Sequence, residues 1–166
     1  MRPRHSHART ILLAAASIAV ALSLAGCKPK LNEATVRDFM DAQIKANDAM
    51  DYSAVCDAYA DDADYTIVVA GNSRPTYMTR SEICDSVSKG YAEAKEHGMQ
   101  AHSEFHIDKI VMKGEVAQVS GTLTETMQAA SGAGNTSTST VMESIKLVYG
   151  KPKILHTAQI VRAVGQ

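Results

Sequence analysis

The feature that most constrains the fold is an alternation of polar and apolar residues through the second half of the chain. Four Val-, Ile- and Thr-rich segments carry it: residues 101–112, 115–128, 141–149 and 153–164. A period of two places the apolar side chains on one face of a strand. We therefore predict four consecutive strands, with turns at residues 113–114 and 150–152 and a mobile hairpin loop over residues 129–139.

The first half of the chain has helical spacing instead. A first helix is expected from residue 32 or 33 to about 49, because apolar residues repeat there at helical intervals: Val36, Phe39, Met40 and Ile44. A second, short helix begins after Asp51 and ends in the acidic run 60–64. A strand over residues 65–70 and a turn cluster over 71–75 follow.

A third helix begins at Thr79, where Thr79 and Glu82 have the spacing of a capping box, and Gly98 can end it. With the four later strands, this order predicts an α+β fold. About three N-terminal helices cover one face of a curved, mostly antiparallel sheet.

The N-terminus has the composition of an export signal. Three arginines precede an almost wholly apolar run of about 15 residues, which is shorter than the roughly 20 that a membrane-spanning helix needs. The run ends in "LAGC" at residues 24–27, which looks like a bacterial lipobox. That resemblance implies cleavage before Cys27 and lipidation of its thiol. We expect residues 1–26 to be a signal peptide, residues 27–33 a lipidated tether, and residues 34–166 the folded domain.

This interpretation predicts where the protein acts. Residues 1–26 contain three of the 17 basic residues and none of the 18 acidic ones, so the remainder has 14 basic residues and a net charge of −4. Such a chain is not suited to nucleic acid or to an anionic membrane surface, so the acyl chains must provide the membrane contact. Lys28 after the lipidated cysteine implies the periplasmic face of the outer membrane in a Gram-negative bacterium. The cell membrane is the alternative.

Two further cysteines, Cys56 and Cys84, remain in the folded part. In an oxidising compartment such a pair can form a disulfide that closes a loop of 28 residues. The alternative is two buried thiols in separate places.

Several phrases, in order, resemble the nuclear transport factor 2-like superfamily, which includes ketosteroid isomerase and polyketide cyclase-like proteins. They are "YSAVCDAYADDADYT" (52–66), "TRSEICDSV" (79–87), "GEVAQVSGTLTET" (114–126) and "IKLVYGKPKILHTAQIV" (145–161). The resemblance spans nearly the whole chain after the tether. It implies a cone in which a bent sheet surrounds the helices and leaves a pocket at the wide end.

Within this resemblance, the catalytic positions of ketosteroid isomerase are mostly not retained. The base position falls near Ile67, which cannot take a proton, and the phenol position falls near Gln43. Only the acid position, near Glu143, keeps a titratable group. The isomerase reaction is therefore not expected.

The function we predict is non-catalytic: the cone binds a small apolar ligand or docks a partner protein. The expected pocket residues are Phe39, Ile44, Tyr65, Ile67, Tyr91, Glu143 and His156. The alternative is a lyase or isomerase that uses His156 as its acid or base, with Glu143 or Asp64. A homodimer through the open sheet face is a third prediction.

No cofactor or metal is expected. The sequence has no nucleophile elbow, phosphate-binding glycine loop or Cys-x-x-Cys motif. His102, Glu104 and His106 share one face of a predicted strand, but we interpret them as a polar surface because Phe105 and Ile107 occupy the core side.

Overall fold

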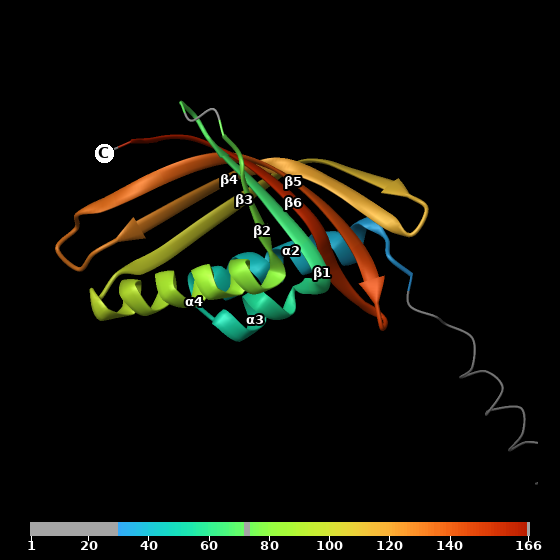
Figure 1. Ribbon diagram of the computed structural model, residues 1–166, viewed down its shortest axis with the longest axis horizontal. Helices are drawn as coiled ribbons and strands as arrows, with labels where there is room; N and C mark the ends of the chain where they lie inside the picture. Colours follow the sequence, from blue (N-terminus) through green and yellow to red (C-terminus); the bar gives the residue numbers. More distant parts are fainter. Residues whose placement is uncertain (1–29, 72–73, 166) are drawn as a thin grey trace, which may run out of the picture.

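The computed structural model describes residues 30–71 and 74–165, so the predicted signal peptide and Cys27 lie outside the described residues. Three helices and six strands form an α+β domain in which the sheet arches over the helices (Figure 1). The helices are α2 (Glu33–Asp48), α3 (Tyr52–Asp57) and α4 (Arg80–Glu96). The strands are β1 (Tyr59–Val69), β2 (Thr76–Thr79), β3 (Gln100–Lys113), β4 (Val116–Gln128), β5 (Gly134–Val148) and β6 (Lys151–Gly165).

Each helix begins at a side chain that accepts a hydrogen bond from a free backbone N–H of the first turn. Asn32 caps α2 and Asp51 caps α3. At α4 the predicted capping box is present, because Thr79 accepts from the Glu82 backbone and Glu82 accepts from the Thr79 backbone. Gly98, with φ +62°, follows the end of α4, a conformation that glycine adopts without steric cost. Within the described ranges, no helix is both long and apolar enough to span a membrane.

The six strands form one curved, unclosed sheet in the order β2-β1-β6-β5-β4-β3. Neighbouring strands are antiparallel except β1 and β6, which are parallel. The predicted α+β class with a mostly antiparallel sheet is therefore confirmed. The register aligns residues of one face across several strands: Tyr65 of β1 pairs with Thr157 of β6, which pairs with Glu143 of β5.

The core lies between the concave face of the sheet and α2. Its buried members are small or aliphatic, since the sequence supplies few aromatics: Val36, Met40, Ala58, Ala117, Val119, Ile145 and Ile154. Val36, Ala117 and Ile145 are completely buried. The core occupies one end of the concave face. The N-terminal half of α2 packs in this core, and the C-terminal half lines the cavity described below.

Two segment predictions were wrong. The acidic run 60–64 does not end a helix but belongs to β1, where Ala60 and Ala63 are buried while the aspartates face outward. Burial of the two alanines, combined with a register shift against β6, outweighs the turn preference of aspartate. The loop predicted over 129–139 is also shorter, because β5 begins at Gly134 and its Thr- and Ser-rich start pairs with β4.

Candidate functional site

The concave face encloses a cavity of about 300 Å³ beyond the packed core. Its apolar wall comes from both helices and sheet: Met40 and Ile44 of α2, Ile83 and Val87 of α4, Ile67 of β1, Met78 of β2, Phe105 of β3, Leu123 of β4 and Val141 of β5. The volume is at the lower end of the range for small-molecule sites, which are typically apolar with a few polar groups. The polar groups therefore determine what the cavity can recognise.

One polar cluster lies where β5 and β6 meet. Glu143 and Thr157 are register partners and both line the cavity. Among the described residues, Glu143 Oε2 and Thr157 Oγ1 are buried without a hydrogen-bond partner. Burial raises the pKa of Glu143 from 4.5 to about 7, and the nearby Thr157 hydroxyl opposes this shift without forming a hydrogen bond of normal geometry.

Two tyrosines of β1 face this cluster. Tyr59 and Tyr65 line the cavity, and burial followed by the negative charges nearby raises the pKa of each phenol above its ordinary range. The Tyr65 hydroxyl donates to Gln159 Oε1, and Gln159 Nε2 donates to Ser139 Oγ at 2.8 Å. Tyr65, Gln159 and Ser139 thus form a chain of hydrogen bonds across β1, β6 and β5.

A second polar cluster lies towards the C-terminal end of α2. Asn47 Nδ2 donates to Ser103 Oγ at 2.7 Å and to Glu125 Oε1 at 3.4 Å, while Asn47 Oδ1 accepts from the Tyr91 hydroxyl. Burial raises the pKa of Glu125, and the Asn47 hydrogen bond opposes the shift. Burial and the Glu125 carboxylate raise the pKa of Tyr91 to about 12. This cluster separates the cavity from an adjoining hollow of about 270 Å³ that Tyr91 helps to line.

Of the residues predicted for the pocket, Ile44, Tyr65, Ile67 and Glu143 line the cavity. Phe39 instead packs against the core, and Tyr91 reaches the site only through Asn47. The assignment of His156 to the pocket was wrong. Its neighbour Thr157 takes the inward position, so His156 lies on the opposite face of β6.

On that outer face His156 Nδ1 contacts Asp64 Oδ1, and both side chains are partly exposed. The pair lies side by side in the parallel register of β1 and β6. Neither residue lines the cavity. His156 and Asp64 therefore do not reach the cavity in which the predicted lyase or isomerase reaction would take place. Exposed apolar side chains, Met142 and Ile160, also mark the outer face.

The two histidines of β3, His102 and His106, lie at the surface, and each is close to different acidic residues. His102 lies 3.5 Å from both Asp48 and Glu104, and His106 lies 3.7 Å from Asp108. Within the described part of the chain, no three His, Cys, Asp or Glu side chains come together as a metal site.

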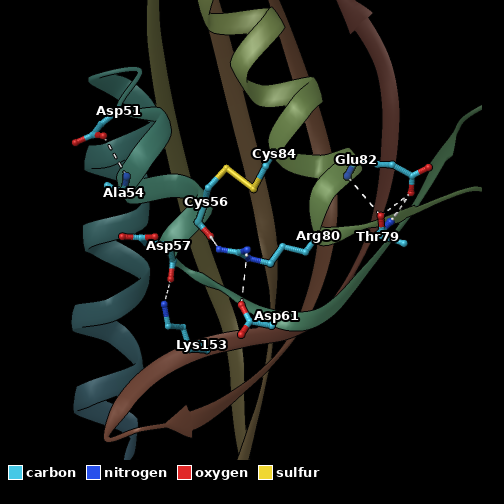
Figure 2. Close-up of a disulfide and its surroundings, with 10 residues drawn as sticks. All are labelled: Asp51, Ala54, Cys56, Asp57, Asp61, Thr79, Arg80, Glu82, Cys84 and Lys153. Atoms are coloured by element: carbon cyan, nitrogen blue, oxygen red, sulfur yellow. Dashed lines mark hydrogen bonds and ion pairs between the residues drawn. A yellow bond between two sulfur atoms is a disulfide. The ribbon is translucent and has the colours of Figure 1, made fainter.

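Cys56 and Cys84 form a disulfide that joins α3 to α4, as Figure 2 shows. Arg80 reaches from the start of α4 to the Cys56 carbonyl oxygen at 3.4 Å and to Asp61 at 3.7 Å. Each cysteine follows a residue of the cavity wall, Val55 or Ile83. The disulfide thereby fixes the distance between two parts of that wall.

Several site residues were not predicted from the sequence: Asn47, Tyr59, Glu125, Thr157 and Gln159. The alternation could have identified two of them. Glu125 shares a face of β4 with Leu123 and Val119, and Gln159 shares a face of β6 with Thr157. For Asn47, no signal in the sequence distinguishes it from a solvent-facing helix residue.

Comparison with protein-family models finds no match, and no curated protein matches the sequence. Solved structures do match in fold. The β subunit of benzoate 1,2-dioxygenase from Burkholderia mallei superposes with a TM-score of 0.69 at 14% identity, over 80% of this chain and 91% of that one. A ketosteroid isomerase-like protein from Erwinia carotovora gives 0.55 at 17% identity, over 79% and 98%.

A nuclear transport factor 2-like protein with a cystatin-like fold from Novosphingobium aromaticivorans gives a TM-score of 0.61 at 12% identity, over 94% of this chain and 92% of that one. The chain therefore has the nuclear transport factor 2-like cone fold. At this identity the similarity extends to the fold alone, since this fold carries many unrelated functions.

Proposed function

We propose that the protein binds a small, mostly apolar molecule in the cavity of the cone. The observation that carries this proposal is the cavity itself, an apolar space of about 300 Å³ with unpartnered polar atoms on Glu143 and Thr157. A buried polar atom without a partner costs about 1–3 kcal/mol, and a ligand that supplies the partner recovers part of that cost.

Binding rather than catalysis is supported by the residue at the position of the isomerase base. Ile67 lines the cavity there and has no group that can accept a proton. The titratable groups that do line the cavity, two tyrosines and two glutamates, all have raised pKa values. The raised values keep the two phenols protonated at neutral pH, so they act in hydrogen bonding rather than as bases.

The proposal is tested by titrating the purified protein with N-phenyl-1-naphthylamine, a neutral apolar probe that fluoresces when removed from water. We expect saturable binding of one probe per chain. Val87→Trp fills the cavity from α4 and should weaken binding at least tenfold. The matched control is Val69→Trp at the half-exposed end of β1, which should leave affinity within twofold. Absence of saturable binding, or equal loss in both variants, would overturn the proposal.

We further propose that the domain is exported and held at a membrane by acyl chains on Cys27, at the periplasmic face of the outer membrane in a Gram-negative cell. The sequence "LAGC" and the Cys56–Cys84 disulfide support this, because disulfides persist in oxidising compartments. Only five residues separate Cys27 from Glu33, the first residue of α2, so the tether spans about 20 Å at most. Incorporation of labelled palmitate that is lost in Cys27→Ala tests the anchor.

The homodimer through the outer sheet face stays a prediction. Exposed Met142 and Ile160 on that face are consistent with it. Light scattering of the purified protein would measure the mass directly, and a monomer at high concentration would contradict it.

A further inference from the structure

We propose that the ligand of the cavity is an organic ammonium ion, with its charged nitrogen at Glu143 and its apolar body against the aliphatic wall. This inference rests on the proposed function and specifies the chemical class of the ligand. It follows from three properties of the lining: the sign of its charges, the state of its hydrogen-bond donors, and the unused acceptor on Glu143.

The charged residues that line the cavity are all acidic. Glu125 and Glu143 line it, and among the residues that the structure describes no Lys, Arg or His side chain does. An anionic ligand would therefore meet two carboxyl groups without a compensating cation. A cation placed at Glu143 meets a carboxyl group in an environment where charges are poorly screened.

Three of the polar side chains that could donate to a ligand carbonyl already donate within the protein. The Tyr65 hydroxyl donates to Gln159, the Gln159 amide to Ser139, and the Asn47 amide to Ser103 and Glu125. Glu143 Oε2, by contrast, is a buried oxygen with no partner. A ligand group that donates hydrogen bonds satisfies this oxygen, and an ammonium group has donors and no acceptor.

The titratable groups near Glu143 determine how its protonation changes when a ligand binds. From β1 the titratable groups beside Glu143 are Tyr59 and Tyr65, whose phenols stay protonated. On β4 the register partner of Glu143 is Val119, and Glu125 lies further along that strand. The cavity residues of α2, α4, β3 and β6 contribute no titratable side chain. In the empty cavity below about pH 7, Glu143 carries a proton. When the ammonium ion binds, Glu143 ionises, its proton leaves to solvent, and the ligand keeps its own charge.

The test compares two ligands of nearly equal shape, 1-naphthylmethylamine and 1-naphthalenemethanol, by calorimetry at pH 6. We expect the amine to bind at least tenfold more tightly than the alcohol. Titrating the amine in two buffers of different ionisation enthalpy should show release of close to one proton, whereas the alcohol should release none. This measurement uses the unaltered protein and does not depend on a variant folding.

Glu143→Gln should reduce amine affinity at least tenfold and abolish the preference for the amine over the alcohol. Glu93→Gln, an exposed glutamate on α4, should change neither. Equal binding of amine and alcohol, or an amine preference that survives Glu143→Gln, would overturn the inference while probe binding still supports the proposed function. If the naphthyl ligands and N-phenyl-1-naphthylamine all fail to bind, the proposed function itself is wrong.

Discussion

Glu143 of β5 and Thr157 of β6 are direct register partners on the concave face, and each carries a buried oxygen without a hydrogen-bond partner among the described residues. A folded chain normally pairs buried polar atoms, because each unpaired one costs about 1–3 kcal/mol. These two adjacent exceptions lie at the wall of an apolar cavity, where the proposed ligand would supply the missing partners. Four predictions examine this site and the structure around it.

The first prediction concerns the pH dependence of stability. Burial raises the pKa of Glu143 from 4.5 to about 7 in the folded state. The folded chain then holds this proton more tightly than the unfolded chain, so the free energy of unfolding falls as the pH rises from 4.5 to 7 and levels off above. A shift of this size corresponds to about 3 kcal/mol. Urea unfolding at several pH values measures it.

Glu143→Gln isolates this contribution, because Glu125 also has a raised pKa and acts in the same direction. Relative to the unaltered protein, the variant should become more stable by about 3 kcal/mol between pH 4.5 and pH 8. The exposed control Glu93→Gln should run parallel to the unaltered protein. A constant difference across this range would show that Glu143 is not buried as a neutral acid.

The second prediction compares two buried hydroxyls on the same face. Thr157→Val replaces an unpartnered hydroxyl with a methyl group of similar size, so the free energy of unfolding should stay equal or rise by up to about 1 kcal/mol. Ser139→Ala removes the acceptor of the Gln159 amide, which then lies buried without a partner. That change should cost about 1–3 kcal/mol. Denaturant unfolding compares them, and a larger loss in Thr157→Val would contradict the unpaired state.

The alternation in the second half of the chain predicted the fold well, because strand pairing and burial follow from one repeated pattern. The capping box at Thr79 and Glu82 likewise marked the start of α4, since both hydrogen bonds are local. Such features depend on neighbours within a few residues. They are therefore readable without knowing how distant segments meet.

The residues that line the cavity were harder to predict, because a side chain reaches the cavity only if its face of the strand points towards the helices. His156 and Thr157 are adjacent, and a one-residue difference in orientation exchanges cavity for surface. Ile154 is buried, so strict alternation would also place His156 inward, but a register shift between the Ile145–Ile154 and Ser144–His156 pairs turns Thr157 inward instead. Asn47 depends on Ser103 and Glu125, which are remote in sequence.

The third prediction concerns Gly121 in β4. A Cβ there would overlap the His106 carbonyl oxygen and lie 2.8 Å from the Phe105 ring, which lines the cavity. Because the carbonyl belongs to the neighbouring strand and cannot move freely, Gly121→Ala should cost about 1–3 kcal/mol. Gly90→Ala on α4 meets open space and should raise the free energy of unfolding by up to about 1 kcal/mol. Equal thermal shifts in the two variants would contradict this close approach.

The last prediction concerns the disulfide between α3 and α4. The Cys56–Cys84 bond closes a 28-residue segment of the chain, and removing it should lower the free energy of unfolding by about 3–4 kcal/mol. Val55 and Ile83, the residues before the two cysteines, both line the cavity, so the wall between the helices should also loosen. The double variant Cys56→Ala, Cys84→Ala should therefore bind N-phenyl-1-naphthylamine several-fold more weakly at a temperature where it remains folded. Reduction of the unaltered protein should give the same loss, which separates the effect of the bond from that of the substitutions. Unchanged affinity in both would show that the packing of α4 against β1, and not the disulfide, fixes the cavity wall.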